Sequence, residues 1–256
     1  MEQKGVHMKN TSLIIAVFVV TLLTTIPLHA AQVWDLYHFK VKAENVAQVV
    51  GAFNRLQDSD VGKNRMASVH LQASIFGGPN GTTHSIVAIY PSRAEFERAS
   101  QSLAGTPEWR AFQRAMSKHT EAVGNSAMQT ITGWGTVSNS DVVWEAIRVN
   151  VTDPAGVVKA FDTMMGSNQA QAFPGQIWLS AVDYGNESQG GVATHVITVG
   201  YESMAEMEAW NDRFMQTKAW EKFQKSIQSR MTLINRELVR FVSVYDHQIS
   251  LEDLDQ

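Results

Sequence analysis

Three side chains in this sequence are suited to proton transfer and charge stabilisation near neutral pH: His38, His70 and Arg148. An imidazole can give or take a proton in that range, and a guanidinium can stabilise an oxyanion that forms on a substrate. The sequence has no cysteine, no Gly-x-Ser-x-Gly elbow and no phosphate-binding glycine loop, which excludes the nucleophilic chemistry that depends on them. We interpret the three residues as candidate catalytic groups.

Several aromatic and polar residues share a strand face with these three and are interpreted as ligand-binding. Residues 34–41 alternate, and Tyr37 and Phe39 are expected to pack under helices, so Trp34 and His38 point to the opposite side. The same alternation assigns to that side His70, Gln72, Trp144, Arg148, Trp178 and Ser180. An aromatic lining with a few polar groups is typical of a small-molecule pocket. The alternative is that each half of the chain merely packs its own core.

Two further histidines, His84 and His195, begin corresponding strands beside glycine-rich loops. Each could act as an acid or base at a cavity mouth, and we include both among the ligand-binding candidates. The alternative is that each satisfies a polar strand end. Periodicity leaves the direction of His84 open.

A metal or haem site made of His38, His70 and His84 is a weaker alternative. The three are scattered and lack the His-x-His or His-x-x-x-His spacing of metal ligands. The sequence therefore predicts no metal and no cofactor.

The chain contains two copies of one unit. Residues 84–117 align without a gap on residues 195–228, and Val33-Trp34-Asp35 corresponds to Val143-Trp144-Glu145. The identical pairs include His84 and His195, Tyr90 and Tyr201, Trp109 and Trp220, and Phe112 and Phe223. We expect a first half at residues 31–137, a second half at 142–248, and a C-terminal tail at 249–256.

Each copy predicts the element order β-α-β-β-α-β, which is ferredoxin-like and belongs to the α+β class. Strands are expected at 34–41, 69–76, 85–90 and 128–134, and again at 144–151, 177–182, 196–201 and 238–245. Ser92 with Glu95, and Ser203 with Glu206, form capping boxes at the start of a helix in each copy. One such sheet carries helices on a single face, so a second copy is its natural cover.

The run Thr106-Pro-Glu-Trp109-Arg-Ala-Phe112, after Tyr90-x-Ser92-x-x-Glu95, resembles the second-helix pattern of antibiotic biosynthesis monooxygenase-like domains. These domains belong to the dimeric α/β barrel superfamily. The resemblance covers both halves and implies an intramolecular pseudo-dimer, with two sheets face to face around a central cavity. Some relatives degrade haem with a histidine on the second helix, but neither helix here has one before His119, so that activity is not expected.

The first 30 residues have the pattern of a signal peptide. Lys4 and Lys9 precede an apolar run from Leu13 to Ile26, which is shorter than the roughly 20 residues that a spanning helix needs. We expect a periplasmic or secreted protein that has no membrane contact after cleavage, with an uncleaved anchor as the alternative. Met1 or Met8 could be the start.

Without residues 1–30 the chain carries 19 basic and 24 acidic side chains, a net charge of −5, with no basic cluster for nucleic acid. The favoured hypothesis is a cofactor-independent monooxygenase or isomerase that acts on a small aromatic molecule. Its rivals are a non-catalytic ligand-binding or partner-binding module, and a scaffold whose cavity is filled by its own side chains. Further oligomerisation is left open.

Overall fold

The computed structural model describes residues 31–185 and 193–254, so the predicted signal peptide lies outside the described residues. The first half consists of β1 (Val33–Val41), α1 (Val46–Gln57), α2 (Asp60–Lys63), β2 (Ser68–Phe76), β3 (His84–Tyr90), α3 (Arg93–Leu103), α4 (Pro107–His119) and β4 (Thr120–Gly135). The second half consists of β5 (Val143–Val151), α5 (Pro154–Met165), β6 (Gln176–Gly185), β7 (His195–Tyr201), α6 (Met204–Phe214), α7 (Lys218–Ile227) and β8 (Met231–Tyr245), followed by α8 (Leu251–Leu254).

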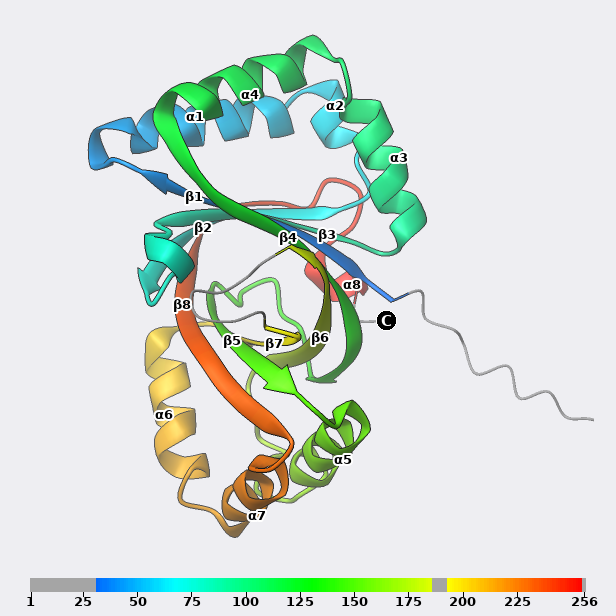
Figure 1. Cartoon of the computed structure of the whole chain (residues 1–256), viewed down its shortest axis with the longest axis vertical. Coiled ribbons are helices and arrows are strands. Elements are labelled where there is room, and N and C mark those ends of the chain that lie inside the picture. Colours follow the sequence, from blue (N-terminus) through cyan, green and yellow to red (C-terminus); the bar gives the residue numbers. More distant parts are fainter. Residues whose placement is uncertain (1–30, 186–192, 255–256) are drawn as a thin grey trace, which may run out of the picture.

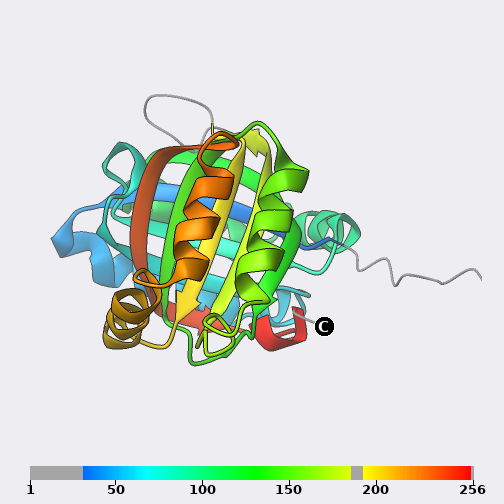
Figure 2. The same ribbon diagram turned by 90° about the horizontal axis from the view of Figure 1, so that it is seen from below.

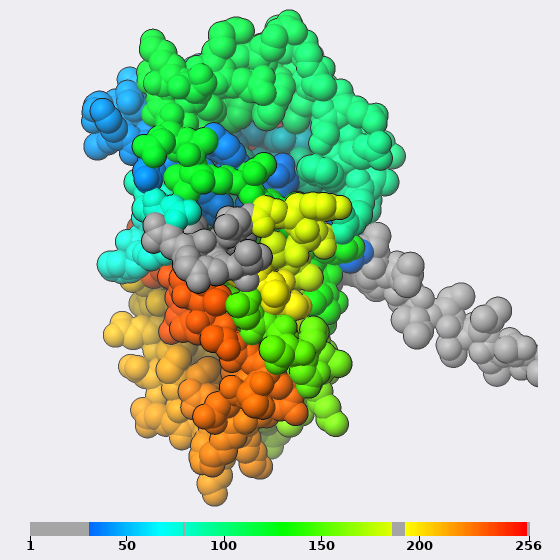
Figure 3. All heavy atoms as spheres, in the orientation of Figure 1, coloured from blue at the N-terminus to red at the C-terminus, as the bar shows by residue number. Residues whose placement is uncertain are grey.

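The eight strands close into one antiparallel barrel in the order β1-β3-β2-β8-β5-β7-β6-β4. Two pairings, β2 with β8 and β4 with β6, join strands of different halves. Helices α1, α3 and α4 cover one side of the barrel, and α5, α6 and α7 cover the opposite side (Figure 1). Seen from below, α5 and α7 lie side by side over the strands of the second half and run roughly along them (Figure 2). The space-filling view shows the two halves in direct contact (Figure 3).

Strand alternation sorts the side chains into three hydrophobic clusters. One lies between the sheet and the helices of the first half, a second lies in the same place in the second half, and a third fills the barrel interior. Phe39 and Leu71 belong to the first cluster, whereas Trp34 and Leu36 belong to the third. The predicted division between helix-facing and inward positions is therefore confirmed for β1.

Side-chain caps begin the helices where the sequence predicts them. The Ser92 hydroxyl accepts a hydrogen bond from the Glu95 amide, and Ser203 does the same with Glu206. Thr106 and Thr217 cap α4 and α7 in the same way. Each such cap satisfies an amide that would otherwise lack a partner, and it is worth about 1 kcal/mol.

The last strand of each half is longer than predicted. β4 begins at Thr120 rather than near Met128, and β8 begins at Met231 rather than near Leu238. The added residues of β4 are small or polar apart from one valine and show no apolar alternation, so the sequence gives little sign of a strand there. Pairing with β1 as far as Val41 extends β4, which is a tertiary effect.

Within residues 249–254, expected as part of a C-terminal tail, the structure has the short helix α8. Leu251 and Leu254 of α8 are buried in the interior cluster, and the side-chain amide of Gln32 donates to the carbonyl of Leu254.

Among the described residues, no helix is long and apolar enough to cross a membrane.

Asp141, in the segment that joins the halves, provides a stability prediction. Burial raises its pKa from 3.8 to about 6, although the Ser138 amide opposes that shift. Between these pH values the unfolded chain releases this proton while the folded chain keeps it, so the Asp141 contribution to stability falls as pH rises. We expect Asp141→Asn to be more stable than wild type at pH 7 and to lose this part of the pH dependence. Urea unfolding at pH 4, 5, 6 and 7 measures the difference, and parallel curves for the two proteins would contradict the assignment.

Candidate functional site

Three tryptophan rings meet in the apolar cluster that fills the barrel interior. Trp178 lies edge-on to Trp34, with ring centroids 5.1 Å apart, and stacks on Trp144 at 5.3 Å. Glycines make room for these indoles, because a Cβ added to Gly133 would lie 2.6 Å from Trp178 and one added to Gly200 would lie 2.7 Å from Trp144. The three rings that were predicted to line a pocket do come together. Trp34 and Trp144 both pack on Trp178, so the rings occupy the space in which a ligand was expected.

The polar residues of the interior are engaged with neighbouring side chains. His38 Nδ1 lies 2.7 Å from the Ser85 hydroxyl, and His70 Nε2 lies 2.6 Å from the Ser68 hydroxyl. Burial lowers the pKa of His70 to about 3, so this imidazole is neutral at physiological pH.

Arg148 forms an ion pair with Glu237, 3.1 Å from Nη2 to Oε2, in which the side chains are only 1% and 2% exposed. The guanidinium charge is thus already balanced within the barrel. Gln72 also lines the interior, while the buried hydroxyl of Ser180 has no hydrogen-bond partner among the described residues.

The free space left in the interior is a cavity of about 40 Å³. That is room for roughly three water molecules. Thr198 and Glu237 line it, and their Oγ1 and Oε1 atoms are buried without a hydrogen-bond partner in the described part of the chain. The expectation of a central cavity for a ring-sized molecule is wrong for this structure, because large side chains occupy the space between the sheets.

His84 and His195 do not face the interior. On β3, the neighbours Ser85 and Val87 line the interior, so His84 lies on the helix-facing side, where its ring stacks on Phe39 at 6.0 Å. Their Nδ1 atoms lie 3.1 Å from Thr83 Oγ1 and 2.9 Å from Thr194 Oγ1, respectively. Burial lowers the pKa of both imidazoles. Each histidine therefore interacts with the threonine that precedes its strand. Neither histidine lines the interior cavity, where the sequence predicted a ligand-binding role for them.

The Arg148–Glu237 pair gives a prediction for the interior. Arg148→Met leaves a buried carboxylate without its cation, and we expect a loss of about 3–5 kcal/mol in the free energy of unfolding. Arg148→Met combined with Glu237→Leu removes both charges and should recover most of that loss. Chemical denaturation of wild type and the two variants measures these differences. If the double variant were no more stable than Arg148→Met, the loss in the single variant would not come from the unpaired Glu237 charge.

A much larger cavity lies outside the barrel, between the sheet of the first half and its helices. We call it the first helix–sheet cavity; its volume is about 650 Å³. Apolar side chains of α1, α3 and α4 form its walls together with the outer faces of β1, β2 and β3. They include Tyr37, Phe53, Leu56, Val69, Ile86, Ala88, Leu103, Trp109, Phe112 and Met116.

Four polar side chains converge on one part of this cavity: Asp35, Gln57, Arg65 and Tyr90. Arg65 is buried and donates from Nη2 to Gln57 Oε1 at 2.6 Å, while its Nε has no hydrogen-bond partner in the described part of the chain. Burial raises the pKa of Asp35, and the Arg65 guanidinium partly offsets that rise. Burial also raises the pKa of Tyr90, against which Arg65 acts by charge and by a hydrogen bond. The cluster therefore joins an acid-base group to a cation that can bind an anion.

The second half has an equivalent cavity of about 400 Å³, the second helix–sheet cavity, beneath α5, α6 and α7. Its lining is mostly aromatic and apolar, with Tyr201 and Glu145 at the positions of Tyr90 and Asp35. Arg65 has no basic counterpart at its own position in the repeat, where Phe173 stands instead.

Comparison with known proteins rests on structure, because no family model and no curated protein matches this sequence. A putative monooxygenase from Fusobacterium nucleatum subsp. nucleatum ATCC 25586 superimposes with a TM-score of 0.58 at 11% identity, over 85% of this chain and 95% of that one. A putative monooxygenase from Lactobacillus acidophilus NCFM gives 0.57 at 10% identity, over 85% and 97%. An anthrone oxidase-like protein gives 0.56 at 12% identity, over 87% and 95%.

The chain has a fold of the dimeric α/β barrel type. The fold implied by the resemblance of the Thr106-Pro-Glu-Trp109 run is thereby confirmed. At these identities the likeness concerns the fold, and chemistry has to be argued from the side chains of this barrel.

The helix–sheet cavities of the barrel are not evident from the sequence, because aromatic residues at helical spacing ordinarily pack in a core. Phe112 and Phe223 are buried, but Trp109 and Trp220 are only partly buried and line the two cavities. The available signal was an acidic residue, Asp35, on the otherwise apolar helix-facing side of β1. Arg65 gave no such signal, since it lies in a loop before β2.

The described residues include no group of three or more His, Asp or Glu side chains that could hold a metal ion. His38 and His70 lie inside the barrel and His84 lies outside it, so the structure does not bring the three histidines together on one face.

Proposed function

We propose that this protein binds a small aromatic molecule in the first helix–sheet cavity and acts on it as a cofactor-independent monooxygenase. The observation that carries the proposal is a cavity of about 650 Å³, aromatic and apolar for most of its surface, that ends at partly buried Asp35 and at buried Arg65 and Tyr90. Its volume lies in the range of about 300–1,000 Å³ that small-molecule sites occupy. Apolar rings would hold the ligand, and the polar cluster would orient it.

The chemistry supported by this cluster begins with proton abstraction next to a carbonyl. The Asp35 carboxylate would take the proton, and its raised pKa makes it a better proton acceptor than an exposed aspartate. The electron pair would pass to the carbonyl oxygen, where the positive charge of the Arg65 guanidinium, which belongs to the cavity lining, would stabilise the negative charge. The resulting carbanion is electron-rich enough to react with O2, which would convert a CH2 group to a carbonyl and release water. Transfer of the proton to another carbon instead would be isomerisation.

The catalytic roles first predicted for His38, His70 and Arg148 would require the interior to open, because each contacts another side chain there. Asp35 and Arg65 offer the same two functions beside an open cavity. A non-catalytic binding module is the alternative, and it would use the same cavity without turnover.

The finer architecture and the location are also proposals. We propose that the barrel is a tandem ferredoxin-like pseudo-dimer, supported by the matching element order of the two halves and by their joining at β2–β8 and β4–β6. We further propose that residues 1–30 direct export, on the strength of their apolar run. Protein recovered from the periplasm or medium should then begin near Ala31, whereas an intact N-terminus on all of the protein would overturn the export proposal.

The proposed activity is tested with the chain from residue 31 onward and anthrone, a tricyclic ketone with an acidic CH2 group. Quenching of tryptophan fluorescence, to which Trp109 contributes, measures binding, and an oxygen electrode measures turnover. We expect Asp35→Asn to bind anthrone but lower kcat by about 10²-fold or more. Arg65→Met should lower kcat by about 10²-fold. Because Asp35 must be ionised to act, kcat should rise with pH through its raised pKa.

Arg236→Met is the matched control, because this variant removes an arginine from the second cavity. If the wild-type protein bound anthrone but took up no oxygen, that result would favour a non-catalytic binding module over an oxygenase. Turnover that is unchanged in both Asp35→Asn and Arg65→Met would remove the proposed site.

A further inference from the structure

We infer that the second helix–sheet cavity is a separate binding site for an uncharged aromatic ligand, and is not a second copy of the first site. The inference rests on how the lining of this cavity differs from that of the first, so it stands whether or not the first cavity is catalytic. Three differences carry it: a lost cation, a neutralised acid and a more aromatic wall.

The cation is lost at the position of Arg65. Phe173 occupies that place in the second half, and its ring lies against Tyr201 and Trp210, with centroids 5.9 and 5.2 Å away. The first cavity has a buried guanidinium with one N–H unpaired at the equivalent point. An anion entering the second cavity would meet aromatic rings there, and burying a charge without a partner is costly.

The acidic residue of the second cavity is already paired. Glu145 Oε1 accepts from Arg236 Nε at 2.7 Å, and Arg236 comes from β8, where its side chain is half exposed at the edge of the cavity. The charges of Glu145 and Arg236 therefore neutralise each other at the rim, and neither is left to pair with a charged ligand. Asn125 stands at the position of Arg236 in the first half, so this pairing is particular to the second.

The remaining wall suits flat apolar molecules. Phe161, Trp210, Phe214, Trp220 and Phe223 present aromatic surface to the cavity, and methionines fill the gaps between them. Thioether side chains adapt to ring shapes and contact them favourably. The volume of about 400 Å³ is enough for two or three fused or linked rings.

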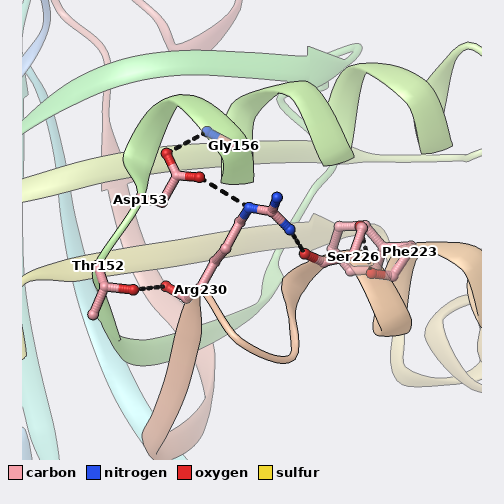
Figure 4. A network of polar contacts seen from close by, with 6 residues as sticks. All are labelled: Thr152, Asp153, Gly156, Phe223, Ser226 and Arg230. Carbon is pink, nitrogen blue, oxygen red and sulfur yellow. Dashed lines mark hydrogen bonds and ion pairs between the residues drawn. The ribbon is translucent and has the colours of Figure 1, made fainter.

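Polar contacts fix two of the helices that cover the second cavity, and its entrance is apolar. Asp153 caps α5 through the Gly156 amide at 2.9 Å and accepts from Arg230 Nε at 2.9 Å, and Arg230 also donates to the carbonyl of Ser226 on α7 (Figure 4). These contacts fix α5 beside α7. At the rim, Met215 and Leu233 line the cavity and are 44% and 56% exposed, which gives an uncharged ligand an apolar way in.

The test uses two fluorescent probes with nearly the same rings. N-phenyl-1-naphthylamine is uncharged, and 8-anilino-1-naphthalenesulfonate carries one negative charge. Met164 and Leu56 occupy equivalent positions in the two halves, both buried and lining their respective cavities. Met164→Trp narrows the second cavity, and Leu56→Trp narrows the first.

We expect Met164→Trp to weaken binding of the uncharged probe by about tenfold or more, which corresponds to about 1.4 kcal/mol. Arg65→Met should leave that binding unchanged and should weaken binding of the sulfonate, and Leu56→Trp should weaken binding of the sulfonate as well. Circular dichroism and thermal unfolding establish that each variant is folded.

Met215→Glu keeps the test decisive if Met164→Trp fails to fold, because this half-exposed residue can change without disturbing the core. It should weaken the uncharged probe several-fold. The inference is overturned if neither second-half variant affects the uncharged probe, or if the sulfonate and the uncharged probe respond alike to every variant. A failure to detect anthrone turnover would count against the proposed function of the first cavity and would leave this inference unchanged.

Discussion

Two strand pairings between the halves, β2 with β8 and β4 with β6, impose the constraint on which the rest of the structure depends. A four-stranded sheet with helices on one face leaves two edges without hydrogen-bond partners and one face without cover. Pairing edge to edge satisfies the backbone groups of four strands at once and turns the two uncovered faces toward each other. The space between those faces must then be filled by side chains or by solvent.

In this chain side chains fill it. Room is left only for about three waters. Trp34 and Trp144 both pack on Trp178, and the Arg148–Glu237 pair and two histidines occupy further space. Glycines at 133 and 200 accommodate the indoles, so the packing depends on small residues as well as on large ones. The interior thus acts as the core that holds the two halves together. Space for a ligand is found on the outer faces, under the helices.

The two outer faces have diverged while their frame has stayed the same. Caps, tyrosines and the acidic residue of the first strand recur in both halves, yet a buried arginine is present in one and a phenylalanine replaces it in the other. A fused chain is free to change one half without changing the other, whereas a homodimer would change both. This freedom explains how one barrel can offer two pockets of different polarity.

The sequence alone determined the repeat, the element order, the helix caps and the inward or outward direction of most strand residues, because periodicity and capping are local properties. It placed Trp34, His38, His70 and Arg148 on the correct face. Only the tertiary structure decided that this face is nearly closed, since the volume left between two sheets depends on how large side chains from all eight strands fit together. The cluster of Asp35, Gln57, Arg65 and Tyr90 likewise needed the fold. It draws single residues from a strand, a helix, a loop and another strand, and no spacing along the chain reveals that they meet.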